Sequence, residues 1–196
     1  GMREKMWHKL GATILPNVNI VDSFELQGIH FGIWYKPYKE MDKNMTTLFD
    51  KKFGEWLEGD INNFVDKTKI VWDPKNYQEK WKRKIKKYPN FVKIKKFEYL
   101  NACQSSLEGI LNGLRRKNFI YVEERLWFIT NTLISILYSL NKEYFSTTKL
   151  FFEDVKRFKI LPKNCIKKVK RIGSLDNRGD LLKKINLLKY LLFDVM

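Results

Sequence analysis

Basic side chains dominate two stretches of this sequence, residues 80–96 and 156–171, and neither stretch contains an acidic residue. The first also carries the aromatic residues Trp81, Tyr88 and Phe91. Lysine and arginine bind the phosphates of nucleic acids, and aromatic rings stack on the bases. The alternative for each stretch is a solvated helix face with its aromatic residues in the core. That alternative explains either stretch alone, whereas two stretches on one face would favour nucleic-acid binding.

The candidate ligands for a nucleotide or another phosphate group within the first stretch are Lys82, Lys84 and Lys86. A second candidate pair, Arg115 and Arg116, lies at the end of a predicted helix. Cations in that position also interact favourably with the helix dipole. The arginine pair therefore has a structural explanation as well as a functional one.

Nucleophilic and metal-binding residues are few. The cysteines are Cys103 and Cys165, and the histidines are His8 and His30. The cysteines form no CxxC motif and no histidine lies at metal-ligand spacing from them, so we predict no zinc site. No histidine combines with a cysteine or serine into a credible nucleophile. We therefore predict no catalytic residue and no metal ligand.

The chain of 196 residues has a formal net charge of +16. This charge predicts an anionic partner, either nucleic acid, nucleotide or an acidic protein. The alternative explanation is a proteome that is rich in Lys, Asn and Ile. No apolar run reaches the roughly 18 residues of a membrane span, so no membrane partner is expected. The cysteine content fits a reduced, cytoplasmic protein.

The elements that would position these residues differ between the two halves of the chain. The first half predicts a short helix over 2–12, strands over 18–26 and 29–35, a helix over 38–53, a short strand over 69–72 and a basic helix over 77–88. Gly28 fits a tight turn between the first two strands. Pro74 ends the short strand, and Asp73 and Asn76 are good helix starters.

The second half is helical throughout. Apolar residues at helical spacing predict helices over 100–114, 122–140 and 145–158, a short helix from Pro162, and a last helix over 180–193 with Asn177 as its cap. Short polar loops between them favour antiparallel neighbours. The expected fold is α+β: a partial mixed sheet followed by a C-terminal antiparallel helical bundle, with domains over 2–89 and 90–196.

Five segments carry a resemblance to a known family. They are Gly28–Pro37 (GIHFGIWYKP), Ile70–Pro74 (IVWDP), Tyr88–Pro89, Ser139–Phe145 (SLNKEYF) and Leu161–Pro162. In this order they resemble bacterial nucleotidyltransferase-like proteins related to the aminoglycoside nucleotidyltransferases, truncated at the N-terminus. The resemblance covers most of the chain from about residue 20. It implies a nucleotidyltransferase-type sheet in front of the helical bundle.

The metal ligands of the resembled enzymes have no counterparts in this sequence. The family holds two magnesium ions with a carboxylate pair that follows a Gly-Ser turn and with a third carboxylate on a later strand. No segment before residue 20 accommodates the turn and the pair, and the third carboxylate aligns with Gly32. The resemblance also implies a general base in the helical domain, of which Glu123, Glu124 or Glu108 would be the remnant.

Three functional hypotheses follow from these observations. The first is a nucleotidyltransferase-like protein that is catalytically inactive or incomplete and binds nucleotide or another anionic partner. The second is a basic nucleic-acid-binding module. The third is an active nucleotidyltransferase whose metal site is completed by a second chain, as in a homodimer formed through an exposed sheet edge. Magnesium and nucleotide are expected as cofactors only under the third hypothesis.

Overall fold

The computed structural model describes residues 5, 13–14, 21–34, 37–49, 58–59, 61, 65, 68–145, 147–174 and 181–195. The chain divides into two compact units, Gly1–Thr46 and Thr47–Met196. The predicted boundary at residues 89–90 falls inside the second unit, where a long helix begins. The predicted helix over 2–12 and the predicted cap at Asn177 lie largely or wholly outside the described residues.

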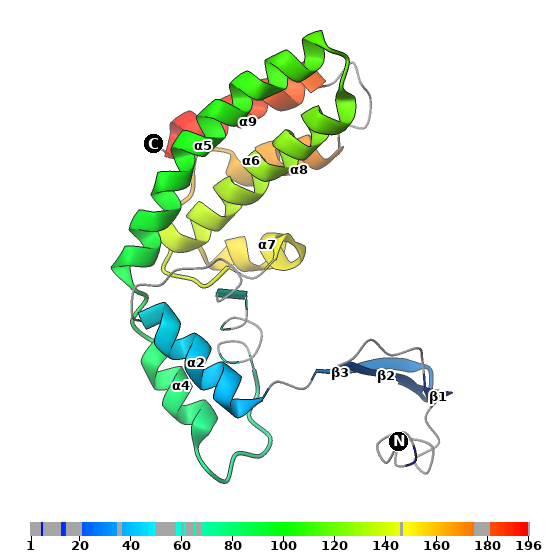
Figure 1. Ribbon diagram of the computed structural model, residues 1–196, viewed down its shortest axis with the longest axis vertical. Coiled ribbons are helices and arrows are strands. Elements are labelled where there is room, and N and C mark those ends of the chain that lie inside the picture. The colour runs from blue at the N-terminus through cyan, green and yellow to red at the C-terminus, as the bar shows by residue number, and fades with distance from the viewer. Residues whose placement is uncertain are drawn as a thin grey trace. The chain divides into compact units, whose positions relative to one another are not determined.

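The first unit contains a small sheet of three strands, β1 (Thr13–Ile14), β2 (Val21–Leu26) and β3 (Ile29–Trp34), in the order β1-β2-β3 (Figure 1). Both strand pairs are antiparallel, so the described sheet is not the mixed sheet that we expected. The predicted hairpin at Gly28 is confirmed. Gln27 and Gly28 both have positive φ, 52° and 76°, as a tight two-residue hairpin turn requires.

Helix α2 (Tyr38–Phe49) follows the sheet, as the helical pattern predicted. It begins after Pro37, whose carbonyl accepts hydrogen bonds from the backbone N–H groups of Glu40 and Met41. Its side chains at Met41 and Met45 are buried. Their spacing of four residues puts them on the same face of the helix.

The predicted strand over 69–72 is absent, and this segment has irregular backbone. Among the described strands none pairs with it, and a strand needs a neighbour for its backbone hydrogen bonds. Helix α4 (Tyr77–Ile85) begins just after it. The Asp73 carboxylate accepts hydrogen bonds from the N–H groups of Tyr77 and Gln78, at 3.0 and 2.7 Å, and this confirms Asp73 as a helix starter.

Two long antiparallel helices, α5 (Asn90–Arg115) and α6 (Phe119–Leu140), form the centre of the second unit (Figure 1). Pro89 precedes α5 in extended backbone, which is the conformation that ends one helix and allows another to begin. Asn118 caps α6 because its side-chain oxygen accepts a hydrogen bond from the N–H of Tyr121. Helix α5 begins ten residues earlier than the apolar pattern over 100–114 predicted.

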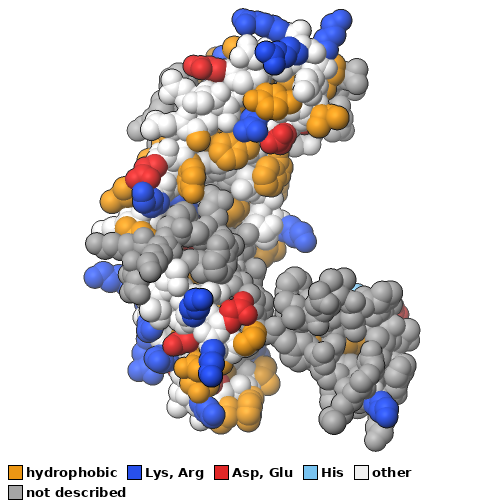
Figure 2. Space-filling view, viewed as in Figure 1, with side chains coloured by type: hydrophobic (Ala, Val, Ile, Leu, Met, Phe, Trp, Pro, Cys, Tyr) orange, Lys and Arg blue, Asp and Glu red, His pale blue; other side chains and the backbone are white. Residues whose placement is uncertain are grey.

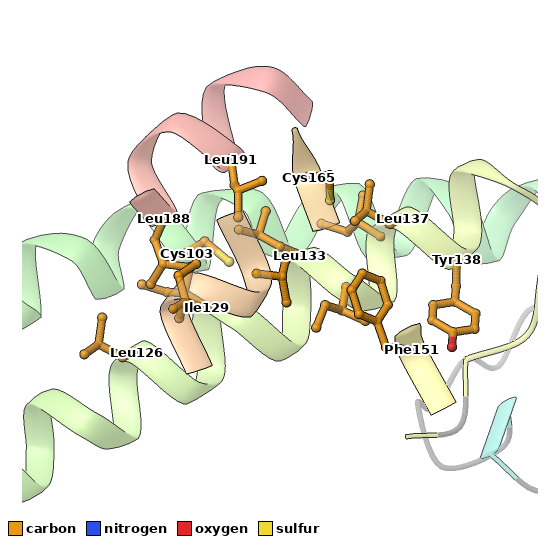
Figure 3. Packing of buried hydrophobic residues seen from close by; sticks show 14 of the residues in the cluster. Cys103, Leu126, Ile129, Leu133, Leu137, Tyr138, Phe151, Cys165, Leu188 and Leu191 are labelled. Carbon is orange, nitrogen blue, oxygen red and sulfur yellow. The ribbon is translucent and has the colours of Figure 1, made fainter. Parts of the chain in front are cut away.

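Shorter elements complete the bundle. They are η2 (Thr148–Leu150), α7 (Phe151–Asp154), η3 (Val155–Arg157), α8 (Cys165–Ser174) and α9 (Leu181–Val195). The helix predicted over 145–158 is thus broken into three short turns. Figure 3 shows the core, in which side chains of α6 such as Leu133 and Leu137 pack with Leu188 and Leu191 of α9. A small antiparallel sheet and a larger helical bundle make the fold α+β.

Candidate functional site

Two neighbouring clefts on the second unit share the residues Lys142 and Glu143. The first cleft has a volume of about 300 Å³ and is lined by Lys82, Ile85, Lys86, Lys142, Glu143 and Tyr144. The second has a volume of about 400 Å³ and is lined by Leu140, Asn141, Lys142, Glu143, Arg157, Lys159 and Ile160. Residues of both basic stretches therefore meet on either side of the turn that follows α6. We call the two clefts together the basic cleft.

Asn141 fixes the turn that separates the two halves of the basic cleft. Its side-chain oxygen accepts hydrogen bonds from the N–H groups of Lys159 and Ile160, at 2.7 and 2.8 Å. Its side-chain nitrogen donates to the carbonyls of Leu137 and Ile160, each at 2.8 Å. One amide side chain thus joins the end of α6 to the chain segment after η3. The next residue, Lys142, has a φ of 59°, and its N–H donates a hydrogen bond to the carbonyl of Ser139 at 3.1 Å.

Tyr144 connects the same turn to α4. Its hydroxyl donates a hydrogen bond to the carbonyl of Ile85 at 3.2 Å, and its ring lies 5.0 Å from that of Tyr88. Both tyrosines are buried. The C-terminal end of α4 carries Lys82 and is followed directly by Lys86. It is therefore held against the turn by buried contacts rather than by surface charges.

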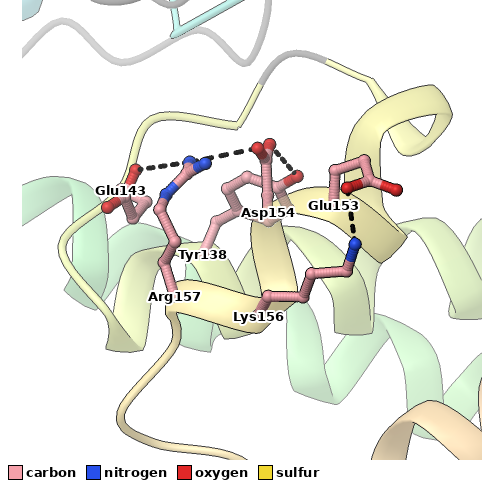
Figure 4. Close-up of polar contacts among 6 residues, drawn as sticks. All are labelled: Tyr138, Glu143, Glu153, Asp154, Lys156 and Arg157. Atoms are coloured by element: carbon pink, nitrogen blue, oxygen red, sulfur yellow. Dashed lines mark hydrogen bonds and ion pairs between the residues drawn. The ribbon is translucent and has the colours of Figure 1, made fainter.

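Arg157 lies in the cleft within a small network of charges (Figure 4). Its guanidinium donates to Asp154 at 3.0 Å and lies 3.8 Å from the Glu143 carboxylate. The hydroxyl of Tyr138 donates to the other oxygen of Asp154 at 2.6 Å. Burial, together with the hydrogen bond to this carboxylate, raises the pKa of Tyr138. Tyr138 therefore stays a neutral hydrogen-bond donor. The positive charge of Arg157 offsets the negative charges of Asp154 and Glu143.

The three lysines predicted on α4 have different positions. Lys82 and Lys86 line the cleft, whereas Lys84 is exposed and lines neither half of it. The ammonium group of Lys82 also donates a hydrogen bond to the carbonyl of Thr68 at 2.7 Å. Lys82 and Lys86 lie four residues apart, so they share a helix face, and Lys84 points elsewhere.

Lys96 belongs to the first basic stretch by sequence but lies in the interior of the second unit. Its side chain is 1% exposed and forms an ion pair with Glu58, which is fully buried. The Lys96 ammonium also donates to the carbonyl of Ser135, and the Tyr88 hydroxyl donates to Glu58. Burial raises the pKa of the Glu58 carboxyl, against the opposing effects of Lys96 and Tyr88. Lys96 is therefore not a ligand for an external phosphate.

Arg115 and Arg116 lie at the other end of α5 and are exposed. Figure 2 shows Lys and Arg side chains gathered where α5 passes into α6. Helix α5 has 26 residues, which corresponds to about 39 Å at 1.5 Å per residue. The two arginines are thus too far along the bundle to join the basic cleft.

Glu123 and Glu124 are exposed and form surface ion pairs. Glu123 lies 3.4 Å from Lys184, and Glu124 lies 2.9 Å from Arg125. Glu108 is also exposed. Exposure and surface ion pairs do not distinguish a general base, so that role stays a prediction.

The residues considered for other chemistry have ordinary environments. Gly32 lies on β3 opposite Ser23. Cys103 and Cys165 are buried, and burial raises the pKa of each thiol to about 11, so both thiols are neutral and poor nucleophiles at pH 7. The exposed His30 lies 3.4 Å from the Ser23 hydroxyl. Within the described ranges, no three His, Cys, Asp or Glu residues are placed to hold a metal ion.

Sequence reasoning missed the turn at residues 141–144 as the place where the two basic stretches meet. The signal was present in part, because Asn141-Lys142 lies between a long apolar helix and a new segment, where chain reversal is common. The pairing of Asn141 with residues 159–160 had no sequence signal.

The described helices include none that is both long and apolar enough to cross a bilayer. Comparison with protein-family models, with curated proteins and with solved structures found no significant match for this chain.

Proposed function

We propose that this protein binds nucleic acid through the basic cleft. The observation that carries the proposal is that the two halves of the cleft share Lys142 and Glu143. Cations from residues 80–96 and from residues 156–171 thereby lie along one continuous surface. The alternative, in which each basic stretch is only a solvated helix face, gives no reason for the two stretches to adjoin one another.

The charges of the cleft support the same proposal. Lys86, Lys142 and Lys159 are exposed, so a phosphate can approach their ammonium groups from solvent. Glu143 is the acidic residue among the lining residues, and Arg157 lies within ion-pair distance of it. Contacts of this kind to the phosphate backbone supply most of the affinity in sequence-independent nucleic-acid binding.

The test compares two neighbouring lysines of α4. We expect Lys86→Glu to weaken binding of a fluorescently labelled, mixed-sequence RNA oligonucleotide by roughly tenfold at low salt. Lys84→Glu is the matched control, because it changes the net charge equally but lies outside the cleft. It is expected to change the dissociation constant by less than about twofold. Fluorescence anisotropy measures both.

Two outcomes contradict the proposal. One is that the wild-type protein does not bind the oligonucleotide at low salt. The other is that Lys84→Glu and Lys86→Glu weaken binding equally, since binding would then follow the overall charge rather than the cleft. Both lysines are exposed, so neither substitution is expected to unfold the protein.

We also propose, as a second candidate, that the chain is a catalytically inactive nucleotidyltransferase-like protein. The observation that favours it is the antiparallel hairpin followed by α2, with Gly32 on the second strand of the hairpin. We expect no magnesium-dependent transfer of a labelled nucleoside monophosphate. Thermal-shift titration with ATP, GTP, CTP and UTP, with and without magnesium, tests nucleotide binding directly.

A saturable, magnesium-dependent thermal shift together with transfer of the nucleoside monophosphate would contradict the proposal that the protein is inactive. If transfer appeared only at protein concentrations at which a dimer forms, the hypothesis of a site completed by a second chain would replace it.

A further inference from the structure

Trp72 is an aromatic side chain with no role in the core of the molecule. It is 82% exposed, and its neighbour Val71 is 92% exposed. The buried tryptophan of this region is instead Trp81, which stacks with Tyr77 at a ring separation of 6.1 Å. Val71 and Trp72 are adjacent, and contiguous exposed apolar surface is the kind that marks binding sites.

The segment that carries Trp72 is anchored on both sides. Before it, the Thr68 carbonyl accepts the hydrogen bond from Lys82, and the Thr68 hydroxyl donates to the carbonyl of Val65 at 2.9 Å. After it, the Asp73 carboxylate caps α4, and the Asp73 carbonyl accepts a hydrogen bond from the N–H of Asn76 at 3.0 Å. The indole is therefore presented on ordered backbone, which reduces the entropy that binding must overcome.

Lys82 links this segment to the basic cleft. The same side chain lines the cleft and holds the Thr68 carbonyl. Helix α4 has nine residues, so it extends about 13 Å. Trp72 precedes the first residue of α4 by five residues, and Lys86 directly follows its last residue. Helix α4 is therefore the element that connects the indole to the cations of the cleft.

We infer that the nucleic acid bound by this protein is single-stranded, with one unpaired base stacked on the indole of Trp72 while neighbouring phosphates lie in the basic cleft. The inference rests on the proposed function and names its ligand class. An indole face binds a base face, and base faces are available in a single strand but covered by neighbouring pairs in a duplex. Cations that follow the backbone beside an exposed aromatic ring are the usual combination in single-strand binding.

The experiment uses the full chain, a labelled 12-nucleotide single strand, and the same strand annealed to its complement. We expect the single strand to bind more tightly than the duplex. Trp72→Ala is expected to weaken single-strand binding roughly tenfold, within the range for loss of one stacked base. Trp72→Phe is expected to restore part of the affinity, because it retains a ring.

The matched control is Trp127→Ala. Trp127 lies on α6 and is 66% exposed, but it lines neither half of the basic cleft. We expect this variant to bind as the wild type does. We also expect the intrinsic fluorescence of the wild type to be quenched by the oligonucleotide, and this quenching to be reduced in Trp72→Ala.

The failures of the two proposals are distinguishable. Equal affinity for single strand and duplex, or equal behaviour of Trp72→Ala and Trp127→Ala, would overturn the stacking inference. If Lys86→Glu still weakened binding more than Lys84→Glu did, the proposed nucleic-acid binding through the basic cleft would stand without the stacking inference. Absence of oligonucleotide binding by the wild type would overturn both.

Discussion

Lys86 and Lys96 show how residues of one basic stretch take opposite roles. Lys86 is exposed and lines the basic cleft, whereas Lys96 is buried and paired with Glu58. Lys96 lies four residues after Val92 and seven before Cys103, and both of these are buried. Its position on the buried face of α5 therefore follows from helical periodicity. The helix predicted over 100–114 did not reach Lys96, so the sequence analysis assigned this residue to the basic stretch and not to a buried helix face.

At the residue scale, we expect Lys96→Met to lower the free energy of unfolding by about 3–5 kcal/mol, because it leaves the Glu58 carboxylate buried without its counter-charge. The control is Lys95→Met. Lys95 forms an exposed pair with Glu98, so a loss of less than about 1 kcal/mol is expected. Urea unfolding followed by circular dichroism measures both.

Equal losses in the two variants would show that the buried pair adds nothing beyond an exposed one. A double variant, Glu58→Gln with Lys96→Met, is expected to recover part of the loss, since it removes both charges together.

The cleft depends on the packing of α5 against α6, because the turn that contains Asn141 and Tyr144 begins where α6 ends. The helices approach closely near their connection, where glycine replaces larger side chains. A Cβ added at Gly113 would lie 2.8 Å from Cγ2 of Val122 and 3.0 Å from Cδ1 of Tyr121. Val122 is fully buried, so it has little room to move.

At the element scale, we expect Gly113→Ala to lower the free energy of unfolding by about 1–3 kcal/mol, as overpacking usually does. Gly109→Ala is the matched control. Its Cβ would meet the hydroxyl of Tyr121 at 2.8 Å, which is the end of a side chain that can rotate away. Alanine also stabilises a helix by about 1 kcal/mol relative to glycine. The control is therefore expected to be near neutral in the same urea experiment.

If Gly113→Ala proved as stable as the wild type, the α5–α6 contact would be able to adjust, and the close approach at Gly113 would not be required.

The formal net charge of +16 acts at the scale of the whole molecule. It attracts any polyanion and raises association rates, but it selects no particular surface. The basic cleft concentrates part of this charge where two separate segments of the second unit meet. Salt dependence separates the two effects, because it counts the phosphates that the protein contacts.

We expect the plot of log K against log salt concentration for single-strand binding to become shallower by about 0.7 in Lys86→Glu, which corresponds to one lost phosphate contact. Lys84→Glu is expected to keep the wild-type slope. Measurements at several salt concentrations between 50 and 200 mM, a range chosen because electrostatic binding falls steeply across it, give the slopes. Unchanged slopes in both variants would locate the contacts elsewhere.

The local elements with strong signals were predicted from the sequence. The hairpin at Gly28, helix α2, the Asp73 cap and the central helices follow from turn chemistry, periodicity and capping, which are properties of neighbouring residues. The prediction of a strand over 69–72 was wrong, because a strand depends on a pairing partner that the local sequence does not specify. The domain assignment and the relation to nucleotidyltransferases stay predictions.

The sequence by itself determined the charge, the acid-free composition of the two basic stretches and the helical character of the second half. Only the tertiary structure decided that Lys86 and Lys159 lie along one surface, that Lys96 is internal and that Arg115 is remote. The physical reason is that these placements depend on contacts between distant residues. Asn141 reaches residues 159–160, Tyr144 reaches Ile85, and Lys96 reaches Glu58, and local patterns carry no record of such pairings.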